Sequence, residues 1–182
     1  ASATKPTGSY LASLGPVPIA VLVLAFAMVA LAGLSLRAGN RELETQASTD
    51  ALTELGNRRK LLADLERRIR TATSDEPAVL TLFDLNGFKN YNDSFGHPAG
   101  DALLLRLGTA LSEAVAPFGG SAYRPGGDEF CVIADASQRG ALEQAAARAL
   151  SETGEGFAIS TAFGTVVIPQ DTRDVTDAMR QA

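Results

Sequence analysis

The chain has few of the residues on which several common site chemistries depend. Its single cysteine, Cys131, lies within an apolar run, which excludes a disulfide framework and a metal site built on cysteines. Its single histidine, His97, lies in a glycine- and proline-containing loop without a serine or cysteine at useful spacing. No nucleophilic triad can therefore be assembled, and His97 is expected to make hydrogen bonds within its loop.

Positive charge is also scarce. The chain has 16 Lys and Arg against 21 Asp and Glu, a formal net charge of −5, and its main basic cluster is the run Arg58, Arg59 and Lys60. This balance argues against a nucleic acid as partner. There is no internal repeat, and no Gly-x-Gly-x-x-Gly motif follows a predicted strand, which argues against a Rossmann dinucleotide site.

Charged residues are absent from Pro6 to Leu36, and the part from Val17 onward is nearly all aliphatic. Twenty helical residues rise about 30 Å, the thickness of the hydrocarbon core of a membrane. A helix buried in a soluble protein rarely runs so long without a polar face, and the apolar region of a signal peptide is shorter, about 7–15 residues. We therefore expect a tail over 1–15, a transmembrane helix over 16–36 and a stalk over 37–49.

The charges beside this segment predict its orientation. Arg37 and Arg41 follow it and only Lys5 precedes it, and the more positive flank of a membrane helix stays in the cytoplasm. We therefore expect a single-pass protein of the inner or plasma membrane, bound to it through residues 16–36, with a cytoplasmic C-terminal domain. The chain begins with Ala and stops at Ala182 within a predicted helix, so we expect it to be an excerpt with a truncated C-terminal helix.

Residues 50–182 alternate between helical and strand patterns. Leucines at helical spacing predict helices, and short apolar runs predict strands. In order, we expect a helix over 58–71, a strand over 78–83, a short helix over 88–93, a loop over 96–100, a helix over 101–114, a hairpin over 122–134, a helix over 140–152, a strand over 157–168 and a helix from 174 onward. Helices that cover an apolar sheet containing a hairpin form a two- or three-layer α/β arrangement.

The most informative motif is the pentapeptide Gly-Gly-Asp-Glu-Phe at 126–130. Its two glycines allow a tight turn, two carboxylates follow, and the apolar run after them is typical of a buried strand. Asp84 ends another predicted strand. If the hairpin lies beside that strand, the carboxylates of Asp84 and Asp128 converge at one edge of the sheet. Two hard oxygen ligands suit Mg²⁺ better than Zn²⁺.

Residues that follow Asp84 could hold a nucleotide. The turn over 85–88 would present backbone N–H groups, and Lys89 adds a positive charge, which together form a plausible cradle for a triphosphate. Asn92 and Asp101 can offer a donor and an acceptor to guanine. From spacing alone, Asn92 could equally cap a turn, and Asp101 could be the N-terminal acid of its helix.

With these residues the chain resembles the GGDEF domain, that is, the diguanylate cyclase family. The motif at 126–130 is the signature that names the family, and other segments agree with it in order and spacing. They are Asp-Ala-Leu-Thr-Glu-Leu-Gly-Asn-Arg-Arg at 50–59, Phe-Asp-Leu-Asn-Gly-Phe-Lys at 83–89, Asn-Asp at 92–93, Gly-His at 96–97, Gly-Asp at 100–101 and Ile-Ser-Thr-Ala-Phe-Gly at 159–164.

The resemblance implies a fold and an activity. The fold, an α/β (α+β) domain over 50–182, is a central sheet flanked by helices, similar to nucleotidyl cyclases and polymerase palm domains. The activity is that of a diguanylate cyclase, a nucleotidyltransferase. Two GTP molecules, one in each domain of an antiparallel homodimer, condense to cyclic di-GMP and two pyrophosphates.

The resemblance also implies a catalytic metal site. The ligands of Mg²⁺ or Mn²⁺ would be the carboxylates of Asp84 and Asp128 and the backbone carbonyl of Leu85. Glu129 would assist the metal site or the activation of the attacking hydroxyl, so that Asp128 and Glu129 form the catalytic pair.

The substrate contacts follow from the same resemblance. Lys89 would contact the phosphates of GTP, while Asn92 and Asp101 would bind its guanine. The family normally continues past Ala182 into a helix whose Lys and Arg bind phosphates, so the phosphate site of this chain is expected to be incomplete. The alternative function is a non-catalytic GGDEF module that binds GTP and regulates a partner.

Overall fold

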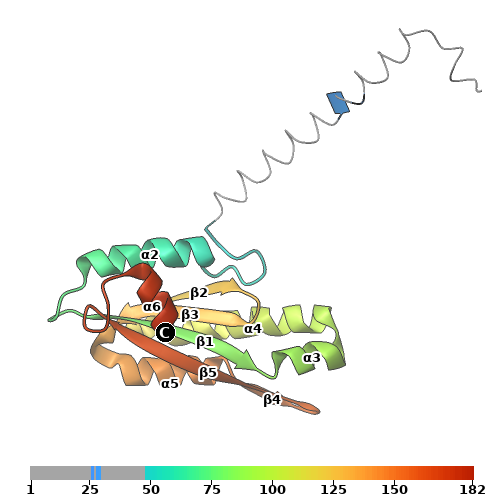
Figure 1. Cartoon of the computed structure of the whole chain (residues 1–182). Helices are drawn as coiled ribbons and strands as arrows, with labels where there is room; N and C mark the ends of the chain where they lie inside the picture. The colour runs from blue at the N-terminus through green and yellow to red at the C-terminus, as the bar shows by residue number, and fades with distance from the viewer. Residues whose placement is uncertain (1–25, 27, 30–47) are drawn as a thin grey trace, which may run out of the picture. The chain divides into compact units, whose positions relative to one another are not determined.

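A computed structural model describes Phe26, Met28, Val29 and residues 48–182 (Figure 1). The chain divides into two units, 1–47 and 48–182. In the first unit, the three described residues are helical and exposed. The second unit contains all of the strands and helices discussed below.

The structure corrects the predicted membrane location. Within the residues that it describes, no helix is long and apolar enough to cross a membrane. The long helix α4 (His97–Val115), for example, carries Asp101, Arg106 and Glu113 on its exposed side. The expected tail, most of the expected span over 16–36 and most of the expected stalk lie outside the described residues. The inferred single-pass location, with the domain on the cytoplasmic side, was therefore wrong.

One five-stranded antiparallel sheet forms the centre of the second unit, with the strand order β2-β3-β1-β5-β4 (Figure 1). The strands are β1 (Ala78–Asn86), β2 (Ser121–Gly126), β3 (Glu129–Asp135), β4 (Glu152–Gly154) and β5 (Phe157–Ile168). The hairpin of β2 and β3 therefore lies directly beside β1. In this arrangement the sequence predicts that the carboxylates of Asp84 and Asp128 converge at one edge of the sheet.

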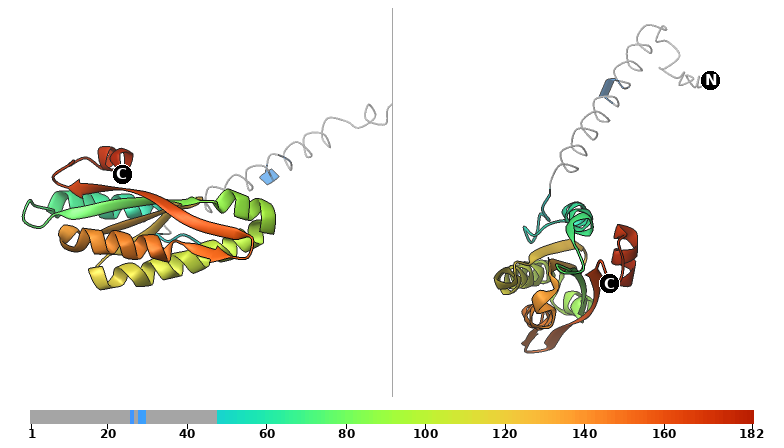
Figure 2. Two further views of the ribbon diagram at one scale, coloured as in Figure 1. Left: turned by 90° about the horizontal axis from the view of Figure 1, so that it is seen from below. Right: turned by 90° about the vertical axis from the view of Figure 1, so that its left-hand side faces the viewer.

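Helices cover both faces of this sheet, which confirms a layered arrangement (Figure 2). The α-helices besides α4 are α2 (Arg58–Thr71), α3 (Phe88–Phe95), α5 (Arg139–Ala149) and α6 (Val175–Gln181), and two short 3₁₀ helices span Ala116–Phe118 and Ala136–Gln138. One face packs against α4 and α5, and the other face packs against α2 and α6. The unit therefore has a three-layer α+β fold.

The alternation of side chains along β1 explains these two cores. Successive residues of a strand point to opposite faces. Val79 and Phe83 belong to the core beneath α4 and α5, whereas Ala78 and Leu80 belong to the core beneath α2. Because β1 is covered on both sides, its sequence is a continuous apolar run rather than an alternating one.

Two boundaries near the candidate site differ from the predicted ones. β1 continues through Asp84 to Asn86, because these residues pair with β5, and Asp84 lies opposite Ala162. The segment predicted as a loop over 96–100 forms the first turn of α4, where Pro98 is tolerated because the first helical N–H groups have no intrahelical acceptor. The three-residue strand β4 was not predicted.

Candidate active site

The acidic end of the hairpin is docked against the end of β1. Asp84 lies directly opposite Glu129 in the antiparallel pairing of β1 with β3. The next residue, Leu85, donates its backbone N–H to the carbonyl oxygen of Asp128 at 3.3 Å. The structure thus brings together Asp84, Leu85, Asp128 and Glu129, four residues singled out in the sequence.

The charges at this edge are uncompensated within the described residues. Asp84 and Glu129 are exposed and Asp128 is half-buried, and none of the three forms an ion pair with another described residue. Like charges that face each other across two strands are destabilising. The arrangement therefore favours the binding of a cation at this edge.

The donor set fits a metal that takes part of its coordination from a substrate. In the described part of the chain, no group of three or more His, Cys, Asp or Glu residues is arranged to hold a metal ion. Mg²⁺ is usually bound by one or two carboxylates together with waters and substrate phosphates. The side chains of Asp84 and Asp128 and the carbonyl of Leu85 are compatible with this kind of site.

We call the sheet edge that carries Asp84, Asp128 and Glu129 the acidic edge. A cavity of about 370 Å³ opens beside it. Its wall includes Asp84 and Glu129, and the ring of Phe163 lies 5.4 Å from the ring of Phe83 on its apolar side. Phe163 is 47% exposed although it belongs to a central region of β5. The acidic edge is therefore bordered by both carboxylates and apolar surface.

The turn between β1 and α3 depends on Gly87. This residue has a φ of 88°, in the left-handed region, and a Cβ atom there would lie 2.8 Å from the carbonyl oxygen of Ala158. Only glycine fits such a position without strain. The tight turn places Lys89, which is exposed, in the first turn of α3 directly after the acidic end of β1.

Asn92 and Asp101 come from two consecutive helices that meet at Gly100. Asn92 lies on α3, and its Oδ1 atom packs against Gly100 of α4, the residue before Asp101. This Oδ1 atom is buried and has no hydrogen-bond partner among the described residues. A buried acceptor without a partner costs about 1–3 kcal/mol, so the placement of this side chain against Gly100 is energetically unfavourable.

The sequence left open that Asn92 caps a turn and that Asp101 is the N-terminal acid of its helix, and the structure tests both alternatives. The backbone carbonyl of Asn92 accepts the N–H of Gly96 at 2.8 Å, but its side-chain amide makes no cap. Asp101 is exposed and lies past the first turn of α4, which starts at His97, so it is not an N-terminal acid of that helix. Neither side chain forms a hydrogen bond or an ion pair with another described residue.

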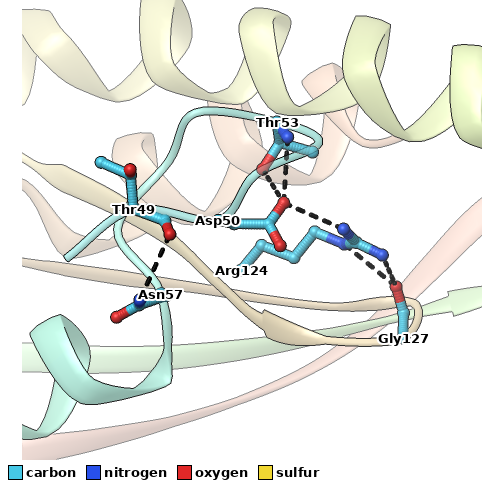
Figure 3. Close-up of polar contacts among 6 residues, drawn as sticks. All are labelled: Thr49, Asp50, Thr53, Asn57, Arg124 and Gly127. Atoms are coloured by element: carbon cyan, nitrogen blue, oxygen red, sulfur yellow. Dashed lines mark hydrogen bonds and ion pairs between the residues drawn. The ribbon is translucent and has the colours of Figure 1, made fainter. Parts of the chain in front are cut away.

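Sequence reasoning did not single out Arg124, which contacts the glycine turn itself. Its guanidinium donates two hydrogen bonds to the carbonyl oxygen of Gly127, from Nε at 3.1 Å and from Nη2 at 2.7 Å (Figure 3). The available signal was a single arginine next to Tyr123 in a predicted hairpin strand, because such a charge must find polar partners if it is buried. Its partner Asp50 is 74 residues away in sequence.

Cys131 has the structural role that its apolar surroundings predict. It is fully buried in β3, and burial, with a smaller contribution from the charge of Glu129, raises the pKa of its thiol to about 12. The thiol is therefore protonated at neutral pH and is not a nucleophile.

Comparison with known families identifies the domain. Residues 47–182 match the family described as "Diguanylate cyclase, GGDEF domain", which is most of the chain. The chain therefore belongs to the GGDEF diguanylate cyclase family.

Several proteins with different names are similar to this chain in sequence. A protein of Streptomyces griseus, named as an uncharacterized protein in the hutH 5′ region, is 38% identical over 143 residues, which are 75% of this chain and 59% of that protein. The cyclic di-GMP phosphodiesterase PdeR of Escherichia coli is 33% identical over 153 residues, 80% of this chain and 23% of that protein. The diguanylate cyclase DgcS of Shewanella oneidensis is 38% identical over 94 residues, 51% of this chain and 31% of that protein. The chain thus spans less than two thirds of these relatives.

Solved structures agree with the fold. A sensory box/GGDEF family protein from Caulobacter crescentus is 33% identical, with a TM-score of 0.65, and the match covers 75% of this chain and 93% of that one. The GGDEF domain of DgcB from the same organism, solved in complex with c-di-GMP, is 25% identical with a TM-score of 0.64, over 74% of this chain and 85% of that one.

Proposed function

We propose that this chain is the catalytic domain of a diguanylate cyclase, which joins two GTP molecules into cyclic di-GMP and releases two pyrophosphates. The observation that carries the proposal is the pairing of Asp84 with Glu129 at the edge where the glycine turn docks. Two facing carboxylates without a cationic partner among the described residues are costly unless the site binds a cation. A nucleoside triphosphate brings such a cation.

In this proposal the metal is held by the carboxylates of Asp84 and Asp128 and by the carbonyl of Leu85. A bound Mg²⁺ or Mn²⁺ would supply charge neutralisation on the phosphates and would favour ionisation of the attacking hydroxyl. Glu129 lies across from Asp84, where it can orient the metal ligands or accept a hydrogen bond from the hydroxyl.

The substrate contacts in the proposal come from the two helices that follow β1. Lys89 pairs with the phosphates, next to the backbone N–H groups of the Gly87 turn. Asn92 and Asp101 bind the guanine. In this assignment the Asn92 side-chain amide donates to an acceptor of guanine, and the Asp101 carboxylate accepts from its N–H groups.

The reaction requires two copies of the site. Each GTP offers its 3′-hydroxyl to the α-phosphorus of the other, so that two P–O bonds form, two pyrophosphates leave and two hydroxyl protons are released. One domain holding one GTP cannot close this ring. We therefore propose a homodimer in which the two acidic edges face each other across the two nucleotides.

A second candidate is a GTP-binding module that regulates a partner without turnover. The similarity to PdeR favours it, because a related sequence occurs in a protein that is named as a phosphodiesterase. Incubation with GTP and Mg²⁺, followed by mass spectrometry of the nucleotides, separates the two candidates. Cyclic di-GMP supports the cyclase, whereas saturable GTP binding without any product supports the regulatory module.

A further inference from the structure

The short helix α3, which carries Lys89 and Asn92, has few restraints of its own. It has eight residues, and isolated helices shorter than about 12–15 residues are marginal in water. The glycines at its two ends, Gly87 and Gly96, have no side chain that could cap it, and Tyr91 is the only buried one of its eight described residues. The position of α3 therefore depends on the elements that pack around Tyr91.

The β4–β5 hairpin, residues 152–159, packs against α3 at one end of the sheet (Figure 1). The ring of Phe157, the first residue of β5, lies edge-on to the ring of Tyr91, with centroids 4.9 Å apart and an interplanar angle of 82°. It also meets the ring of Phe95 at 5.9 Å, and the rings of Tyr91 and Phe95 lie 4.8 Å apart. Such pairs stabilise contacts beyond the apolar area that they bury. This aromatic cluster therefore joins α3 to the hairpin.

The hairpin provides the space that the ring of Phe157 occupies. Gly154 lies directly opposite Phe157 in the pairing of β4 with β5. A Cβ atom at Gly154 would overlap the ring of Phe157. An aromatic ring commonly covers a glycine on the neighbouring strand at the edge of a sheet. The side chain of Phe157 thus lies beside the backbone of β4 and contacts Tyr91 of α3.

An ion pair links the same hairpin to α4. Nη2 of Arg106 lies 2.7 Å from Oε1 of Glu152, the first residue of β4, and Nε lies 3.4 Å from Oε2. The side chains are 50% and 32% exposed, so the pair is weaker than a buried one, but its two-pronged geometry fixes how the two groups approach. The hydrogen bond with Glu152 and, to a smaller extent, the phenol of Tyr91 raise the pKa of the Arg106 guanidinium. The ion pair and the aromatic cluster are therefore neighbours.

The hairpin is thus attached to both helices of the proposed guanine site. Phe157 contacts α3, which carries Asn92, and Glu152 binds Arg106 of α4, which also carries Asp101. Two side chains from different helices can bind one base only when the helices are held at the matching separation. A hairpin fastened to both helices restrains that separation.

We propose that the β4–β5 hairpin holds α3 in place against α4, and that Phe157 and Arg106 are positioning residues for the guanine contacts of Asn92 and Asp101. Both act on the nucleotide only through the two helices. The inference rests on the proposed function for its effect on GTP binding, whereas the packing that it describes is independent of turnover.

A charge reversal tests the ion pair. Arg106→Glu places two carboxylates against each other, and Arg106→Glu combined with Glu152→Arg restores opposite charges. The apparent affinity falls with the fraction of molecules whose helices are correctly placed. We expect the Kd of 3′-deoxy-GTP, measured by calorimetry, to rise about 2- to 5-fold in the single variant, the range for an exposed pair. The double variant should return toward the value of the unsubstituted chain.

Arg139→Glu is the matched control for the change in net charge. Arg139 binds Glu143 within α5, with Nε 2.7 Å from Oε1, and its side chain is 44% exposed. The substitution removes a pair of similar geometry and makes the same change in net charge, at a helix that carries none of the proposed site residues. Its Kd should equal that of the unsubstituted chain. In steady-state assays, Arg106→Glu should raise the KM for GTP and leave kcat at saturating GTP unchanged.

Hydrogen exchange tests the aromatic cluster without nucleotide. The amide of Tyr91 donates to the carbonyl of Gly87 at 3.0 Å, and the amide of Gly96 donates to that of Asn92 at 2.8 Å, so the two amides report both ends of α3. We expect their exchange to accelerate about 2- to 12-fold in Phe157→Leu, the range for one aromatic pair. The amide of Val132, in the middle of β3, should keep its protection.

Gly154→Ala provides a second variant that leaves Phe157 in the chain. Its Cβ atom displaces the ring from β4, so both amides of α3 should again exchange faster and the Kd of 3′-deoxy-GTP should rise. If Phe157→Leu does not fold, Gly154→Ala carries the same test.

Three results would overturn the proposal. Unchanged Kd and unchanged exchange in Phe157→Leu and Gly154→Ala would do so, as would equal acceleration of exchange throughout the domain, which would indicate a merely structural role. A double charge reversal that binds no better than Arg106→Glu would remove Arg106 from the proposal. If the unsubstituted chain makes no cyclic di-GMP, the proposed function fails, while the exchange of the α3 amides still decides whether the hairpin holds that helix.

Discussion

Substituting Gly100 by alanine should weaken GTP binding without unfolding the domain. A Cβ atom at this position in α4 would overlap the Oδ1 atom of Asn92, closer than van der Waals contact allows. The side chain of Asn92 must therefore turn to another rotamer. Because the proposed role of Asn92 is to bind guanine, the substitution tests that role without removing the amide.

The expected magnitudes can be worked out from this contact. Alanine in place of glycine in a helix interior stabilises it by about 1 kcal/mol. Displacing a neighbouring side chain costs about 1–3 kcal/mol, so the net loss of stability should not exceed about 2 kcal/mol. Loss of one hydrogen bond to the ligand, about 0.5–1.5 kcal/mol, corresponds to a rise in Kd of about 2- to 12-fold.

Isothermal titration calorimetry with 3′-deoxy-GTP measures this Kd, because that nucleotide lacks the hydroxyl required for reaction. Gly140→Ala is a matched control: Gly140 lies in α5, and a Cβ atom there meets nothing within 4 Å. Its Kd should equal that of the unsubstituted chain. An unchanged Kd in Gly100→Ala would refute the reasoning that Asn92 contacts the guanine.

Three further predictions concern other residues. Asp101→Ala should weaken GTP binding and spare the thermal unfolding transition, and wild-type affinity would remove Asp101 from the site. Tyr123→Phe should lower the free energy of unfolding by about 1.5 kcal/mol, because the hydroxyl of Tyr123 donates to the buried Asp64 carboxylate at 2.7 Å. Urea titration measures this loss, and an unchanged unfolding midpoint would contradict the prediction. Burial opposes ionisation of Asp64, but Tyr123, Lys60 and Arg67 outweigh it and lower its pKa below 3.8. Its contribution to stability is thus present above about pH 4 and lost on further acidification, and Asp64→Asn should flatten that dependence in thermal melts.

Much of the domain could be predicted from local patterns. Leucines at helical spacing identified α2, and the apolar run at 78–83 identified β1, because periodicity reports which side of an element is buried. The motif at 126–130 predicted a turn that carries acidic residues. The structure places that turn beside β1, where Asp84 and Glu129 face each other.

The features that were missed depend on contacts between distant residues. The continuation of β1 through Asn86 comes from pairing with Ser160 on β5, and no local signal encodes it. The bridge from Asp50 through Arg124 to Gly127 likewise joins segments that only the fold brings together. The predicted membrane location failed for a different reason, since it rested only on the length and apolar composition of residues 16–36 and on the charges beside them.

The central claim is that the acidic edge formed by Asp84, Asp128 and Glu129 condenses two GTP molecules. The most direct test is to quantify both products after incubation of the 1–182 chain with GTP and Mg²⁺, next to Asp128→Ala. The account predicts one cyclic di-GMP for every two pyrophosphates, and neither product from Asp128→Ala. Bound GTP without cyclic di-GMP in the unsubstituted chain, or equal rates in the two proteins, would contradict it.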